Sequence, residues 1–158
     1  MVGMEINIGI TDDARKTIAA DLSRLLADTY ALYLKSQNYH WNVTGPMFSA
    51  LHLMFEGHYI ELRDAVDAIA ERIRSLGYPA PGSFSEFTKL TGIAEGNSAN
   101  DAMTMVRDLA AGHEACARTA RTAVAGAETA GDVATADLAT VRVEVHEKTA
   151  WMLRATAA

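Results

Sequence analysis

The sequence predicts an all-α fold, a four-helix bundle, and three observations support this. Apolar residues recur at steps of three and four through four long segments, and no window alternates as a β-strand would. The three prolines and most glycines lie outside these segments, so they mark the connections. A chain of 158 residues suits a single domain over residues 1–158, with residues 1–10 as an N-terminal tail.

Two helices are predicted in the first half of the chain. The first spans residues 11–42, where Thr11 is a candidate N-cap and two aspartates follow in the positive first turn. A break at Thr44-Gly45-Pro46 leads to a second helix over residues 48–76, which ends at Gly77. The predicted core stripe of the second helix, about 120° wide, consists of Leu51, Met54, Phe55, His58, Leu62, Ala65, Val66, Ile69, Ile73 and Leu76.

A long connection separates these helices from two more. Residues 77–96 form it, with one or two short helical turns expected at residues 83–87. A third helix is expected to begin after Asn97-Ser98 and to reach residue 125, and a fourth to begin near Asp132. Their apolar stripes are Val106, Leu109, His113, Ala117, Ala120 and Val124, and Leu138, Val141, Val145, Thr149 and Met152. The long connection allows the second and third helices to run parallel, the ferritin-like arrangement with a short extra helix.

Composition narrows the class of protein. The formal net charge is −6, so bulk electrostatics disfavour nucleic acid as a partner. The chain contains no run of about 18 apolar residues, so no membrane span is predicted, and the acidic first 30 positions do not fit a secretory signal. The single cysteine, Cys116, cannot close an intrachain disulfide, which agrees with a cytoplasmic protein.

Four polar residues share one face of the second helix. His52 and Glu56 are i,i+4 neighbours, as are Asp67 and Glu71, and all four lie within about 100° of one another, away from the core stripe. His52 and Asp67 are nevertheless about 22 Å apart along the helix axis. One copy of the helix therefore cannot bring both pairs to one metal ion.

A second subunit could complete such a site. If two copies of this helix meet antiparallel about a two-fold axis, His52 faces the partner's Glu71 in the same register in which Glu56 faces the partner's Asp67. His40 lies as far before Pro46 as His52 lies after it, so the two histidines are level on antiparallel helices. Imidazoles with carboxylates suit a redox-active metal such as Fe(II), so the sequence predicts iron oxidation between subunits.

These residues carry a resemblance to the Dps mini-ferritins. The stretch Tyr39-His40-Trp41-Asn42-Val43-Thr44-Gly45, then His52, then Asp67-Ala68-Ile69-Ala70-Glu71-Arg72 is similar to the family signature. Nearly the whole chain fits the family layout, including the fourth helix from Asp137 through Trp151.

The resemblance implies a role for each of these residues. His40 and His52 of one subunit, with Asp67 and Glu71 of its two-fold partner, correspond to the ferroxidase ligands. Glu56 matches a carboxylate that assists a second iron, and Trp41 matches an aromatic that absorbs stray oxidising equivalents. The family forms a hollow cytoplasmic dodecamer that oxidises Fe(II) with hydrogen peroxide or oxygen and stores Fe(III) mineral. Asp132 and Asp137 are candidates for its acidic three-fold pores.

The candidate site residues also have interpretations that involve no iron chemistry. The four residues on the second helix also fit a solvated polar face, and Glu56 fits a surface charge or an ion pair with Arg63. Trp41 fits a packed interface aromatic. His58 and His113 are expected to be packed structural histidines, Cys116 a buried inert thiol, and His146 a surface residue.

Two other functions compete with iron oxidation and storage. Many relatives bind DNA through a lysine-rich tail, but residues 1–10 contain no lysine or arginine and only Arg154 lies near the C-terminus. Nucleoid binding and compaction is therefore disfavoured. The remaining alternative is a helical interaction protein that kept the fold and lost the chemistry.

Overall fold

The computed structural model describes residues 4–158, which contain five helices and no strand. The helices are α1 (Asp12–Asn42), α2 (Phe48–Ser75), α3 (Phe84–Leu90), α4 (Ala102–Thr129) and α5 (Val133–Thr156). The predicted all-α fold is thus confirmed. Of the predicted N-terminal tail, residues 4–10 precede α1 without helical structure, and residues 1–3 lie outside the described part.

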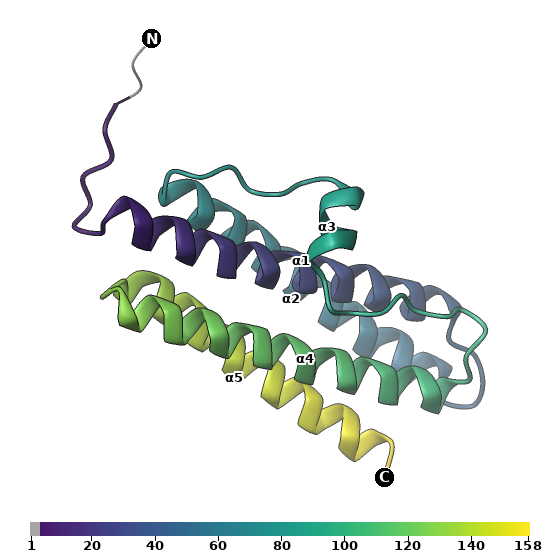
Figure 1. Cartoon of the computed structure of the whole chain (residues 1–158). Coiled ribbons are helices and arrows are strands. Elements are labelled where there is room, and N and C mark those ends of the chain that lie inside the picture. Colours follow the sequence, from purple (N-terminus) through teal and green to yellow (C-terminus); the bar gives the residue numbers. More distant parts are fainter. Residues whose placement is uncertain (1–3) are drawn as a thin grey trace.

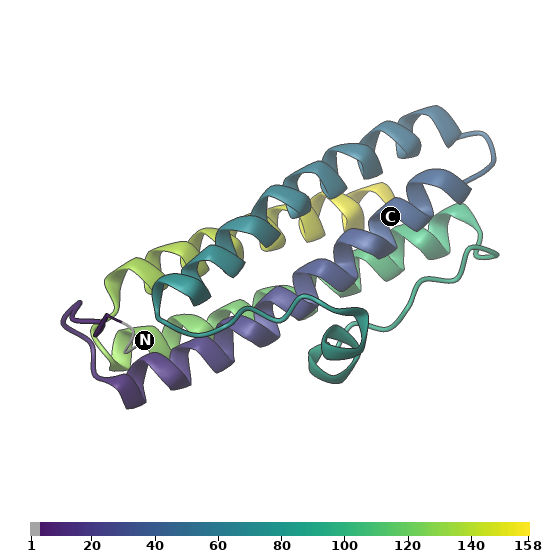
Figure 2. The same ribbon diagram turned by 90° about the horizontal axis from the view of Figure 1, so that it is seen from above.

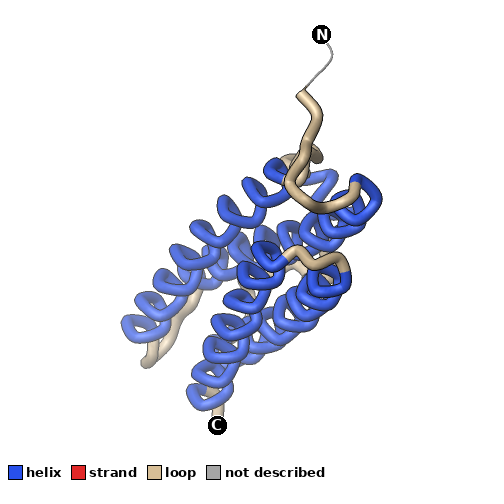
Figure 3. The backbone as a smooth tube through the Cα atoms, turned by 90° about the vertical axis from the view of Figure 1, so that its left-hand side faces the viewer, coloured by secondary structure: helices blue, strands red, loops and turns tan. Residues whose placement is uncertain are grey.

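The four long helices form the predicted bundle. α1 and α2 make one antiparallel hairpin, α4 and α5 make another, and α1 packs against α4 (Figure 1). The connection after α2 returns along the outside of the bundle, so that α2 and α4 run in the same direction, as the sequence predicts (Figures 1 and 2). The long helices lie side by side (Figure 3), and α3 lies on the outer side of α1 (Figure 2).

Side-chain caps fix most helix starts. Thr11 accepts a hydrogen bond from the backbone N–H of Ala14 at 3.3 Å, as its predicted capping role requires. The predicted turns at residues 83–87 are a seven-residue helix, α3, which a capping box between Ser83 and Glu86 begins. The positive φ of Gly77, +94°, lies just beyond α2, where the sequence places the helix end.

The third long helix starts later than predicted. Asn97 and Ser98 do not open it, because the Asn97 side chain accepts a hydrogen bond from the N–H of Ala99 at 3.0 Å and closes a turn. Asp101 is the N-cap instead and accepts from Thr104 N at 2.9 Å. The helix also continues to Thr129, four residues beyond the predicted end.

The buried face of α5 differs from the predicted stripe. The buried residues of this helix are Thr135, Ala139, Arg142, His146, Ala150 and Leu153. This set is displaced by one residue, or about 100° of rotation, from the predicted stripe. Val141 and Met152 of that stripe are instead 48% and 46% exposed. The prediction followed apolar residues, whereas the side of α5 that faces the bundle carries polar ones.

One buried carboxylate fastens the long connection to the bundle. Asp28, on α1, accepts hydrogen bonds from Thr91 Oγ1 and Gly92 N of the connection, at 2.7 and 2.8 Å, and from Thr119 Oγ1 of α4 at 2.7 Å. These bonds hold α3 against α1. No helix within residues 4–158 is long and apolar enough to cross a membrane.

Candidate metal centre

His40 and His52 meet at the closed end of the α1–α2 hairpin. Their rings stack with centroids 3.8 Å apart and planes 15° from parallel. Each Nδ1 lies 2.7 Å from the backbone carbonyl oxygen of the other histidine. The prediction that the two residues are level on antiparallel helices is therefore correct.

This reciprocal bonding determines where the protons lie. A carbonyl oxygen only accepts hydrogen bonds, so each Nδ1 carries the hydrogen and donates it. In a neutral imidazole the other nitrogen, Nε2, then has a free lone pair. Backbone carbonyls commonly orient metal-binding histidines in this way. With each Nδ1 engaged by a carbonyl, Nε2 is the nitrogen of each ring that is left to bind a metal ion.

Aromatic side chains support the histidine pair on both sides. Phe48 stacks on His52 at a centroid distance of 5.0 Å, and Tyr59 meets His40 edge-on at 5.1 Å. His40 is only 7% exposed, and His52 is partly buried. Tyr59 was not among the residues predicted for this site, although its position seven residues after His52 places it on the same face of α2.

The predicted carboxylates do not join the histidines within one chain. Asp67 and Glu71 are exposed on α2, about 22 Å and about 28 Å along its axis from His52. Glu56 is partly buried one turn after His52. In residues 4–158 no group of three His, Cys, Asp or Glu side chains is arranged to hold a metal ion. One chain therefore supplies the imidazoles at one end of α2 and the carboxylates nearer the other.

None of the carboxylates of Glu56, Asp67 and Glu71 has an ion-pair partner within the described residues. The alternative partner of Glu56, Arg63, instead pairs with Asp64 through Nε at 3.2 Å. Trp41, next to His40 in sequence, is 63% exposed. These groups leave an acidic and aromatic surface along α2 and the end of α1.

The two pore candidates have different environments. Asp132 is buried, caps α5 by accepting from Thr135 N at 3.0 Å, and pairs with Arg72 Nη2 at 2.8 Å. Arg72 therefore neutralises the Asp132 carboxylate, which disfavours a pore role for it. Asp137 is exposed on the first turns of α5, and its pore role stays a prediction.

His146 is not the surface residue that the sequence analysis expected. It is fully buried, and its Nδ1 lies 2.9 Å from Nδ1 of His113. Its Nε2 accepts from Arg142 Nη2 at 3.2 Å, and the Arg142 guanidinium pairs with both carboxylate oxygens of Glu61. The expectation failed because Glu144 and Glu147 beside His146 are on the outer side of the helix.

Burial keeps these interior histidines neutral. It lowers the pKa of His146 to about 3 and the pKa of His58 to about 4, and the charge of Arg142 adds to the effect on His146. Burial also lowers the pKa of His113 well below its usual value, and the neighbouring histidines and Arg142 lower it further. His113 is a packed interior histidine, as predicted. Burial likewise raises the pKa of the Cys116 thiol, in agreement with an inert residue.

Sequence comparison places this arrangement in a family. Residues 19–158 match the ferritin-like domain. An uncharacterized low temperature-induced protein of Nostoc is 42% identical over 151 residues, which cover 94% of this chain and 84% of that protein. DNA protection during starvation protein 2 of Bacillus anthracis is 33% identical over 140 residues, 89% of this chain and 96% of that one.

The solved structures agree with the sequence relatives. The Dps protein of Vibrio cholerae O1 superposes with a TM-score of 0.94 at 30% identity, over the full length of both chains. The chain belongs to the Dps family of ferritin-like proteins. The Vibrio protein is described as a member of a superfamily of ferritin-like diiron-carboxylate proteins. The Dps fold of this chain thus accounts for the bundle, its long connection and the extra helix α3.

Proposed function

We propose that this Dps protein is a ferroxidase that oxidises Fe(II) at sites shared by two-fold-related subunits and stores the Fe(III) product. The reciprocal hydrogen bonding of His40 and His52 carries the proposal, because it leaves both Nε2 atoms free on a rigid support. Asp67 and Glu71 of the partner subunit supply the carboxylates. Glu56 assists a second iron, and Trp41 takes up stray oxidising equivalents.

Each group has a distinct task in this mechanism. The two imidazoles bind Fe(II) through nitrogen, and the carboxylates balance its charge and stabilise Fe(III) as it forms. Hydrogen peroxide accepts two electrons and two protons to give two waters, so it consumes the electrons of two Fe(II) ions. Oxygen is the alternative oxidant. Removing Fe(II) and peroxide together limits the formation of hydroxyl radicals.

The unpaired carboxylates support a shared site over a solvated surface. Asp67 and Glu71 are exposed and without ion-pair partners in the described part of the chain, while the imidazoles are held at the other end of the same face. An antiparallel dimer brings the two halves together twice, which makes two identical sites. We propose that such dimers build a hollow dodecamer in the cytoplasm, with the mineral inside.

Iron oxidation kinetics test this proposal. We expect His52→Ala combined with Asp67→Ala to abolish rapid Fe(II) oxidation by hydrogen peroxide, because the double variant removes a ligand from each half of every site. Asp64→Ala is the matched control, since Asp64 is an exposed carboxylate on the same helix that forms an ion pair with neighbouring Arg63. Stopped-flow absorbance of Fe(III) gives the rates, and sedimentation checks assembly. Wild-type rates in an assembled double variant would exclude this site.

DNA binding is the competing function, since relatives carry the name DNA protection during starvation protein. The net charge of −6 opposes contact with phosphates, so we propose protection through iron removal. We expect no gel shift of linear DNA at about 50 or about 200 mM salt, the range over which phosphate contacts weaken most visibly. A shift at the lower salt that disappears at the higher one would show direct electrostatic binding.

A further inference from the structure

Arg142 lies at the centre of a polar cluster in the bundle interior. Its side chain is only 7% exposed, and a guanidinium keeps its positive charge in proteins. A buried charge is stable only where other groups compensate it. Glu61 of α2 does so with both carboxylate oxygens, of which Oε2 lies 3.0 Å from Arg142 Nη2. His146, one turn further along α5, accepts a hydrogen bond from the same Nη2 at 3.2 Å. One carboxylate and one imidazole thus bind a single cationic group.

The guanidinium fixes the direction of the hydrogen bonds deeper in the cluster. Because arginine only donates, Nε2 of His146 is the acceptor, and the hydrogen of this neutral ring lies on Nδ1. That Nδ1 donates to Nδ1 of His113 at 2.9 Å. The hydrogen of the neutral His113 ring then lies on Nε2, which is buried and has no hydrogen-bond partner within residues 4–158. Neither ring therefore has a nitrogen lone pair left for a metal ion.

The side chains around the guanidinium are those that a metal ion would use. Metal sites in helix bundles are built from inward-facing carboxylates and histidines of facing helices, and a carboxylate and a histidine three residues apart are a recurring pair. His58 and Glu61 have this spacing on α2, in the reverse order. The buried Nδ1 of His58 has no hydrogen-bond partner within the described chain, and its ring meets His113 edge-on at 5.7 Å. Helices α2, α4 and α5 thus each contribute a possible metal ligand.

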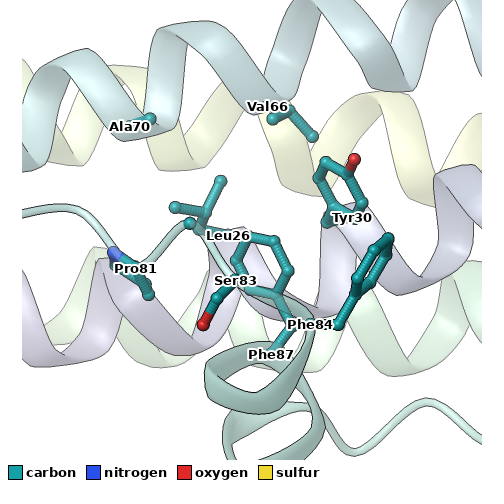
Figure 4. A pocket seen from close by; sticks show the side chains of 9 residues that line it. Leu26, Tyr30, Val66, Ala70, Pro81, Ser83, Phe84 and Phe87 are labelled. Carbon is teal, nitrogen blue, oxygen red and sulfur yellow. The ribbon is translucent and has the colours of Figure 1, made fainter.

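The pocket beside α3 offers a metal ion no comparable ligands. Leu26, Val66 and Phe87 are among the residues that line this pocket of about 350 Å³, and none of its lining residues is charged or a histidine (Figure 4). Val66 directly precedes Asp67, so the pocket belongs to the side of α2 proposed for the second subunit. The cluster around Arg142 is therefore the place within one chain where a cation meets both a carboxylate and imidazoles.

We propose that Arg142 is the resident cation of a latent metal site built on Glu61 and His146, and that its charge keeps metal ions out of the bundle. His113 and His58 complete the site. Loss of the guanidinium frees the carboxylate and the Nε2 lone pair of His146, and the histidines can then exchange tautomers. The Glu61 side chain is 40% exposed, so an ion can reach the site from solvent. The inference goes beyond the proposed function and does not depend on it.

Arg142→Met tests the proposal, because it removes the positive charge and keeps an unbranched side chain. Zinc is a suitable probe, since imidazole nitrogen and carboxylate oxygen are among its usual ligands. Calorimetric titration of the full-length protein with Zn²⁺ counts the bound ions, and an anomalous-scattering map of soaked crystals locates them. We expect Arg142→Met to bind one more Zn²⁺ per chain than the unmodified protein, at a position between Glu61 and His146. That position distinguishes it from ions bound at His40 and His52.

Arg142→Lys is the matched control, because lysine keeps a positive charge at this position and should bind no additional ion. Adding Glu61→Gln to Arg142→Met removes the carboxylate and should abolish the additional site. If Arg142→Met does not fold, Arg142→Gln replaces it, since glutamine is uncharged and still donates a hydrogen bond toward His146. No additional Zn²⁺ in a folded neutral variant would overturn the proposal. Zn²⁺ between Glu61 and His146 in the unmodified protein or in Arg142→Lys would overturn it as well.

Discussion

His40 and His52 show how a backbone can set the chemistry of a side chain. Each imidazole donates its Nδ1 hydrogen to the backbone carbonyl of the other histidine, so the geometry of one hairpin fixes the tautomer of both rings. The sequence predicted that the pair would be level, because both residues are equally spaced from the turn. It could not predict the reciprocal hydrogen bonds, which depend on ring rotations that only packing by Phe48 and Tyr59 decides.

The interior histidines make stability depend on pH. His58, His113 and His146 have pKa values below that of a free imidazole, about 6.5, so the unfolded chain binds more protons than the folded one once the pH falls below that value. Stability is therefore lost on acidification. Each histidine lowers the free energy of unfolding by about 1.4 kcal/mol per pH unit between its unfolded and folded pKa.

Urea unfolding at pH 7 and pH 5, at one protein concentration, measures this effect. We expect a lower free energy of unfolding at pH 5. His146→Gln should show a smaller loss between the two pH values, because it removes one of the groups that take up a proton on unfolding. Equal free energies at pH 5 and pH 7 in the unmodified protein would mean that these histidines are not held neutral.

At the scale of elements, the α1–α2 hairpin is what brings the histidines together. Only residues 43–47 separate the two helices. Gly45 has φ +104° in this turn, with open space where a Cβ would lie, so backbone conformation alone requires glycine there. The turn was predictable from Thr44-Gly45-Pro46, since glycine and proline interrupt helices for local reasons.

Gly45→Ala tests the role of this turn. We expect it to lower the free energy of unfolding by about 1 kcal/mol, the usual cost of a left-handed backbone for a residue with a Cβ. Gly82→Ala is the control, because Gly82 has an ordinary φ and equally open surroundings. Thermal or urea unfolding of both variants provides the comparison. An equal effect of the two substitutions would show that the turn conformation carries no strain for alanine.

The packing face of α5 shows where sequence reasoning failed at this scale. Its buried side includes Arg142 and His146, whose partners Glu61 and His113 come from α2 and α4. The apolar periodicity predicted a different buried side, because Val141 and Val145 each precede a buried residue by one position and lie on the more exposed side of the helix. Polar residues that find partners only in the folded bundle carry no such signal in a single sequence.

At the scale of the whole molecule, the proposed function divides each iron site between two subunits. The imidazoles lie at one end of α2, and the exposed carboxylates Asp67 and Glu71 lie about 22 Å and about 28 Å further along the same helix. This separation was predictable, because it follows from residue numbers and helical rise. The second subunit follows from the sequence only as a geometric requirement of the proposed site.

Co-expression of His52→Ala and Asp67→Ala subunits tests the shared site most directly. Each variant alone should lose rapid Fe(II) oxidation. In a mixed two-fold dimer, one site lacks both altered ligands and the other keeps every ligand. Random pairing should therefore restore about a quarter of the unmodified protein's activity. Co-expression of His52→Ala with His40→Ala should restore none, since both imidazoles of a site come from one subunit.

Stopped-flow oxidation of Fe(II) by the purified mixed particles gives the decisive comparison. Recovery in the histidine–aspartate mixture but not in the histidine–histidine mixture is the result that an iron site built by two subunits predicts. If neither mixture exceeds its parent variants, although the subunits have assembled together, Asp67 of one subunit does not serve the histidines of another.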